Sequence, residues 1–133
     1  MTERKMAGWW MVLLGAIGLL LLLVYIYWSK GVYVSIINNT QKVLEKVSIA
    51  YTGGTINIEK LEPHTSYGQY VNPASESHLE LEWFEPSGVK QSHKIDVYFE
   101  HNYSGSIEIT VDPNNRISWI SKVRVRLLLE IKG

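Results

Sequence analysis

The chain has 133 residues, with 13 basic residues balanced by 13 acidic ones, no cysteine and a hydrophobic fraction of 46%. This length limits the chain to one domain plus an appendage. The balanced charge argues against a dedicated nucleic-acid-binding protein. The absence of cysteine excludes a disulfide scaffold, a thiolate zinc site and a cysteine nucleophile.

The hydrophobic residues gather near the N-terminus, where residues 8–28 carry no charge. As a helix this segment would be about 31 Å long, and a bilayer core is about 30 Å thick. Aromatic side chains of the kind that favour membrane interfaces flank it on both sides: Trp9, Trp10, Tyr25, Tyr27 and Trp28. The sequence therefore predicts a single transmembrane helix over residues 8–28, preceded by a short tail over residues 1–7.

A cleaved signal peptide is the main alternative to this anchor. Its apolar region would span about 7 to 15 residues and would end at a small-residue cleavage site. The segment is longer, and the nearest small pair, Ser29 and Gly31, makes a poor site. Arg4 and Lys5 lie directly before the apolar segment, which favours a cytoplasmic N-terminus and an extracytoplasmic C-terminal domain, periplasmic in a Gram-negative cell.

Residues 30–133 show a different pattern, in which short runs rich in Val, Ile, Tyr and Trp alternate apolar with polar residues. Such alternation is typical of strands with one buried face. The predicted runs lie at 32–37, 47–51, 56–58, 67–71, 78–83, 94–100 and 107–111. Turn residues separate them at intervals near those of a sandwich or barrel. We expect an all-β domain, a small antiparallel β-sandwich of immunoglobulin-like architecture.

The last segment, residues 117–131, alternates apolar and basic residues and predicts one long strand. Trp119 and Ile120 disturb the alternation, so a kink or turn near Ser121 stays open. On the polar side of this strand lie Lys122, Arg124 and Arg126, which we consider as possible lipid or partner contacts, because basic residues near a membrane attract anionic headgroups.

Acidic residues gather earlier in the chain, with eight between Glu76 and Asp112 against two lysines. Glu80 and Glu82 are the acidic residues that we consider as a partner contact. The alternative is that the acidic and basic runs are solvated sheet faces, paired across strands.

One strand carries three residues that could ligate zinc: His78, Glu80 and Glu82 would project from the same face. Positions two apart on a strand are about 6 to 7 Å apart, so a metal would need a further ligand from a neighbouring strand. An exposed polar face is the expected outcome. No motif indicates a catalytic site, a cofactor site or a small-molecule substrate.

The order of features resembles uncharacterised single-pass envelope proteins of bacteria with a β-sandwich domain. The similar segments cover most of the chain after the apolar segment: residues 37–40, 61–63, 76–81, 97–100 and 103–105. The resemblance implies a location in the bacterial envelope and a β-sandwich, and it carries over no active site.

Three functions fit these observations. The first is a non-enzymatic binding or accessory module that contributes a membrane helix and a sandwich to a larger envelope complex, with the loop at Tyr103 and Gly105 or a sheet edge as the contact. The second is an immunity-type protein whose acidic stretch from Glu76 to Glu100 binds a basic toxin. The third is a metal-dependent enzyme built around His78. The expected partners are the lipid bilayer and other envelope proteins.

Overall fold

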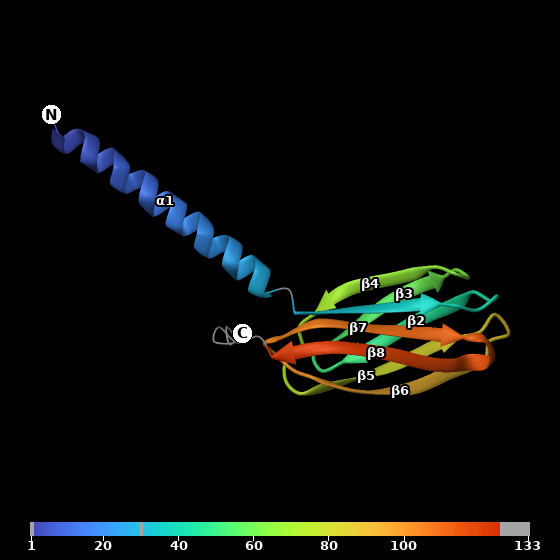
Figure 1. Cartoon of the computed structure of the whole chain (residues 1–133). Coiled ribbons are helices and arrows are strands. Elements are labelled where there is room, and N and C mark those ends of the chain that lie inside the picture. Colours follow the sequence, from blue (N-terminus) through green and yellow to red (C-terminus); the bar gives the residue numbers. More distant parts are fainter. Residues whose placement is uncertain (1, 30, 126–133) are drawn as a thin grey trace.

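The computed structural model describes residues 2–29 and 31–125, as one helix followed by eight strands (Figure 1). A single turn of 3-10 helix, η1, occupies Pro113–Asn115. The elements in chain order are α1 Thr2–Ser29, β1 Val32–Asn38, β2 Leu44–Tyr51, β3 Gly54–Leu61, β4 Ser66–Val71, β5 Ser77–Phe84, β6 Lys90–Phe99, β7 Tyr103–Asp112 and β8 Arg116–Val125.

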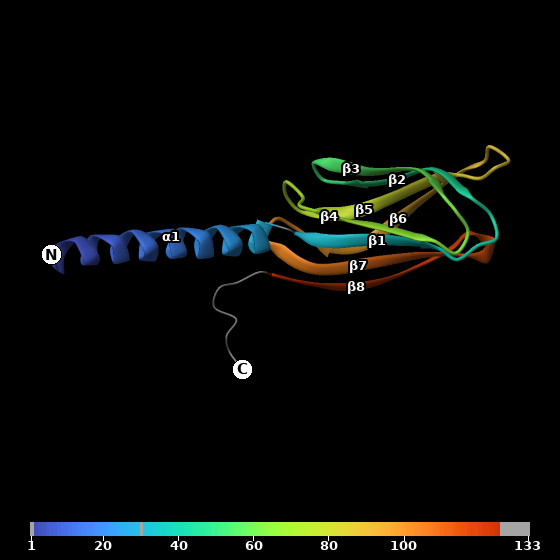
Figure 2. The ribbon, with the colours of Figure 1, turned by 90° about the horizontal axis from the view of Figure 1, so that it is seen from above.

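The N-terminal helix α1 projects away from the strands (Figures 1 and 2). It begins at Thr2, so the predicted tail over residues 1–7 is helical from its second residue. Between Gly8 and Tyr25 none of its side chains is buried. By length and composition this is a helix apolar enough to cross a membrane. Only residues 30 and 31 separate α1 from β1.

The eight strands form two facing sheets (Figure 2). Sheet A has the order β4-β1-β7-β8, and sheet B has the order β3-β2-β5-β6. The prediction of an all-β domain with two layers is confirmed. Strands β2, β3, β6 and β7 are longer than predicted, and β8 runs through Ser121 without a turn. The remainder of the strand predicted over 117–131 lies outside the described residues.

One strand pair differs from the expected antiparallel arrangement. In the described part of the chain, five of the six strand pairs are antiparallel, whereas β1 and β7 run parallel, with Val32 opposite Gly105 and Asn38 opposite Val111. Between β1 and β7 the chain forms β4 of sheet A and all four strands of sheet B. Parallel neighbours need a long crossover connection of this kind. Both strands therefore start at the end of the sandwich where α1 joins, which we call the helix-proximal end.

The core lies between the two sheets and follows the alternation of the sequence. In β1, Val32, Val34 and Ile36 are buried, whereas Tyr33 between them is exposed. The largest fully buried side chains are Trp83 of β5 and Phe99 of β6. Burial of such side chains contributes about 1.5–3 kcal/mol each, so apolar packing stabilises a domain that has no disulfide.

A buried amide, Asn38, closes the helix-distal end of the core. Its Nδ2 atom donates to the carbonyl oxygens of Lys42 at 2.8 Å and Leu61 at 2.9 Å. Its Oδ1 atom accepts from the backbone N–H of Thr40 at 3.0 Å. The backbone of Asn38 also pairs with Thr65 and His64. Asn38 thus joins the ends of β1, β2 and β3 through one fully hydrogen-bonded side chain.

Replacing Asn38 with Ala should destabilise the sandwich by about 2–4 kcal/mol, because two carbonyl oxygens lose their donor inside the protein. Chemical denaturation with circular dichroism measures this loss. Asn39→Ala is the matched control. Its side chain makes an exposed bond to Asp112, and the expected loss is about 0.5 kcal/mol. Equal losses for the two variants would contradict the role of Asn38.

Candidate functional site

The helix-distal end of the sandwich carries four connections that together form a surface, which we call the distal rim. They are residues 39–43, 62–65, 85–89 and 113–115. The register places them far from α1, because β1 starts beside the helix and ends at Asn38. A rim of loops carried on a rigid sheet scaffold is a common location for binding sites.

A pocket of about 330 Å³ opens in the distal rim. Trp83 lies at its base and is fully buried. Glu85 accepts a hydrogen bond from Asn115 Nδ2 at 3.4 Å, which joins two of the loops. The pocket is lined by Thr40, Gln41, Lys42, Val43, Leu44, Trp83, Glu85, Pro113, Asn114 and Asn115. Such a mixture of an aromatic base with both charge signs at the edge suits a polar, protruding segment of a partner.

Trp83, which lines the pocket, and His93, which stacks on it, each have a buried polar atom with no hydrogen-bond partner within the described residues. The two atoms are Trp83 Nε1 and His93 Nε2, on rings that stack at 5.2 Å between centroids and 13° between planes. The Trp indole is a donor only. An unpaired buried donor costs about 1–3 kcal/mol.

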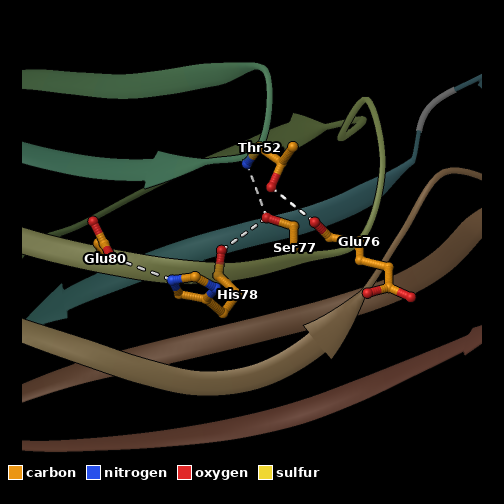
Figure 3. A network of polar contacts seen from close by, with 5 residues as sticks. All are labelled: Thr52, Glu76, Ser77, His78 and Glu80. Atoms are coloured by element: carbon orange, nitrogen blue, oxygen red, sulfur yellow. Dashed lines mark hydrogen bonds and ion pairs between the residues drawn. The ribbon is translucent and has the colours of Figure 1, made fainter.

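The predicted zinc ligands lie on the outer face of sheet B, at a different place from the pocket. Figure 3 shows His78 and Glu80 facing each other, with His78 Nε2 and Glu80 Oε1 at 3.3 Å. Glu82 instead pairs with Lys90 at 3.4 Å. The structure brings no third ligand to His78 and Glu80, and residues 2–29 and 31–125 contain no group of three potential ligands.

Ser77 and Thr52 attach the β2–β3 turn to the start of β5 (Figure 3). The Ser77 hydroxyl accepts from Thr52 N–H at 2.9 Å and donates to the carbonyl of His78 at 2.8 Å. The Thr52 hydroxyl donates to the carbonyl of Glu76 at 2.8 Å. Because these bonds satisfy backbone groups at a strand end, the network has a structural explanation.

The basic residues of β8 lie on the outer face of sheet A, opposite the face that carries Glu80 and Glu82. Lys122 is opposite Ser106 of β7 and Arg124 is opposite Ser104, at the helix-proximal end. Both side chains are exposed. Arg126, the third predicted contact, lies outside the described residues.

The prediction that Tyr103 and Gly105 belong to a loop is wrong, because both residues lie in strand β7 and pair with β8. Tyr103 is half-buried, packs on the core and contacts the Tyr98 ring edge-on at 6.0 Å. Gly105 has φ +116°, and a Cβ atom there would overlap the carbonyl of Lys122. Any side chain at Gly105 would disturb the pairing of β7 with β8, so a substitution there tests the fold as well as the contact.

The predicted membrane-interface residues Trp9, Trp10 and Tyr25 are all exposed on α1. The side chains of Tyr27 and Trp28 lie outside those that the structure describes. The sequence did not predict the distal pocket, because its lining comes from three separate connections and from the strand residues Leu44 and Trp83.

The chain is similar in fold to a solved structure described as the NMR structure of the protein from Eubacterium rectale. The TM-score is 0.51 and the sequence identity is 14%, over 69% of this chain and 88% of that chain. No family model matches the sequence. No curated protein sequence matches it either. At this identity the likeness concerns the fold alone.

The pKa of Tyr98 is raised above its ordinary value of 10.0, first by partial desolvation and then by the carboxylates of Glu100 and Glu76. The native state therefore favours the neutral phenol. The resulting contribution to stability is present below the pKa of unfolded tyrosine, about 10, and is lost as the pH rises through the native value.

Phenolate absorbance, titrated for the protein and for Tyr98→Phe, measures this shift. The difference between the two curves should have its midpoint above 10, and Glu100→Gln should lower that midpoint. Asp96→Asn is the control, because Asp96 does not contribute to the shift. A difference curve with its midpoint at or below the ordinary value would contradict the assignment.

Proposed function

We propose that the chain is a membrane-anchored, non-enzymatic binding module that serves as an accessory subunit of a larger envelope complex. In this proposal α1 spans the bilayer with its N-terminus in the cytoplasm, and an immunoglobulin-like sandwich lies outside the cytoplasmic membrane. The expected partners are the lipid bilayer and other membrane or envelope proteins.

The observation that carries the proposal is the connection between an exposed apolar helix and the first strand of the sandwich. The helix buries none of its side chains from Gly8 to Tyr25 against the rest of the chain. A helix that is apolar on every side needs lipid or another protein to cover it. The aromatic residues at both ends support lipid. A signal sequence can also form an apolar helix of this length near the N-terminus. The poor cleavage site after the helix argues against that alternative.

The partner surface in this proposal is the distal rim. With two residues between α1 and β1, the helix-proximal end must stay at the membrane surface, so the opposite end faces away from it. The distal pocket, with Trp83 at its base and Lys42 at its edge, is therefore presented to proteins in the adjoining compartment.

An accessory role is favoured over a toxin-binding role by the arrangement of the acidic residues. Glu82 pairs with Lys90 of β6, and Glu80 is opposite Lys94 of β6 in the register. The outer face of sheet B is thus partly neutralised within the domain, whereas a basic toxin would require uncompensated acidic residues.

If α1 is an anchor, the protein isolated from its source should retain all 133 residues and should stay in the membrane fraction after alkaline carbonate extraction. Intact-mass spectrometry of both fractions gives the answer. A soluble protein whose chain begins after residue 28 would instead establish a cleaved signal sequence. Leu20→Arg is a companion variant, because a charge at the helix centre costs about 2.5–3.5 kcal/mol on insertion and should lower membrane retention.

If the distal rim binds the partner, a photo-crosslinking residue at Gln41 should form adducts with a discrete set of membrane proteins in native membranes. Gln41 is exposed and lines the pocket. The matched control is Ser75, exposed in the β4–β5 connection at the helix-proximal end. Adducts from Ser75 alone would move the partner surface to the other end, and adducts from neither position would argue against an accessory role.

A further inference from the structure

The helix-proximal end of sheet A carries four exposed residues on one face, which we call the proximal corner: Tyr33, Tyr70, Lys122 and Arg124. The register brings them together. Tyr33 of β1 is opposite Tyr70 of β4 on one side and Ser106 of β7 on the other, and Ser106 is opposite Lys122 of β8. Residues opposite each other in a sheet project from the same face.

The two tyrosines form an aromatic pair next to the point where α1 joins the sandwich. Their rings meet edge-on at 5.1 Å between centroids, and the side chains are 38% and 52% exposed. Tyrosine is an amphipathic residue that is enriched at the headgroup level of membranes. The sheet therefore adds two aromatic residues to those that the sequence has near the end of α1.

The two basic residues beside this pair, Lys122 and Arg124, take part in no ion pair among residues 2–29 and 31–125. Arg116, the third exposed basic residue of β8, is opposite Asp112 at the other end of the strand. Glu108 of β7 lies on the same face, opposite Ile120 and two residues from Ser106. Two basic residues and one acidic residue thus leave this part of the face with a net charge of +1. The acidic residues Glu76 and Glu100 lie around Tyr98, which projects from the other sheet.

The connection to α1 keeps the proximal corner close to the bilayer. Tyr33 follows Ser29 by four residues, so it lies at most about 14 Å from the helix end along the chain. At physiological salt the attraction of a charged surface falls off over about 8 Å. The headgroup region projects beyond the hydrocarbon core and so brings its charges closer to the domain. A tethered domain needs only a small preference to settle against the surface, because the tether already supplies a high effective concentration.

The geometry points to a second membrane contact: the proximal corner lies on an anionic lipid surface and fixes the tilt of the sandwich. This inference rests on the proposed anchor. The tyrosine rings lie among the headgroups, and Lys122 and Arg124 bind their phosphates. Each basic residue near an anionic surface favours the docked state by about fivefold, or about thirtyfold for two, and Glu108 on the same face opposes part of this effect.

The test uses the full chain with a spin label at Ser104→Cys, the residue opposite Arg124. The natural sequence has no cysteine, so the label has one possible position. The protein is reconstituted into vesicles of phosphatidylcholine alone, or of phosphatidylcholine and phosphatidylglycerol in equal parts. Collision of the label with a water-soluble nickel complex should fall several-fold in the anionic vesicles and should recover at high salt.

The double variant Lys122→Gln/Arg124→Gln should restore accessibility in anionic vesicles, and Arg116→Gln should leave the protection unchanged. A label at Ser118→Cys, exposed on the same face of β8 at the distal end, should stay accessible in every vesicle. Equal accessibility of Ser104 in the two lipids would overturn the inference, as would protection that appears only in native membranes, which would assign the face to a protein. Failure of the chain to float with either vesicle would instead disprove the anchor.

Discussion

The two-residue connection between α1 and β1 determines which end of the sandwich lies beside the helix and which end lies away from it. Strand β1 is paired on both sides, with β4 and with β7. Its first residue, Val32, is level with Val71 and Gly105, and Gly105 is level with Val123 of β8. One short covalent link therefore positions a whole row of sheet A beside the helix. Each strand of sheet A has one end beside the helix and its other end at the distal rim. The distal rim is therefore the end of the sandwich farthest from α1.

Hydrogen bonding at Asn38 stabilises the opposite end of the same strand. The side chain bonds carbonyl oxygens of Lys42 and Leu61, so the strands β1, β2 and β3 end at a common level. Because Thr40 and Lys42 belong to the wall of the distal pocket, the shape of that pocket depends on this buried amide. A polar group in the core stabilises the fold only when all its hydrogen-bond partners are present. The hydrogen bonds of Asn38 therefore hold the pocket wall at Thr40 and Lys42 in place as part of the fold.

Local sequence patterns predicted most of the elements, because the burial of alternate residues is a local property. The apolar segment predicted α1, and period-two alternation predicted the strands and the inward side of residues such as Leu81 and Ile109. Long-range pairing was not predictable in this way. The contact from Asn38 to Leu61 spans 23 residues, and the parallel pairing of β1 with β7 joins segments about seventy residues apart in the printed sequence. The proximal corner combines β4, β1 and β8, so no window of the sequence contains it.

Part of the charge segregation along the chain reappears between the two outer faces of the sandwich, although Glu108 and Asp112 of the acidic stretch lie on sheet A with the basic residues. The sequence showed an acidic stretch followed by a basic one, and sheet order converts this into Glu80 and Glu82 on sheet B and Lys122 and Arg124 on sheet A. On sheet B, Lys90 pairs with Glu82 and Lys94 is opposite Glu80, so these two lysines compensate part of the charge. On sheet A, Lys122 and Arg124 lie near α1, with Glu108 beside them on the same face. An anionic surface beside the helix end would attract one face and repel the other, and this difference gives a tethered domain a preferred tilt. A fixed tilt would hold the distal pocket at a defined height and direction, so that a partner in the same membrane would meet it with less orientational freedom to lose on binding.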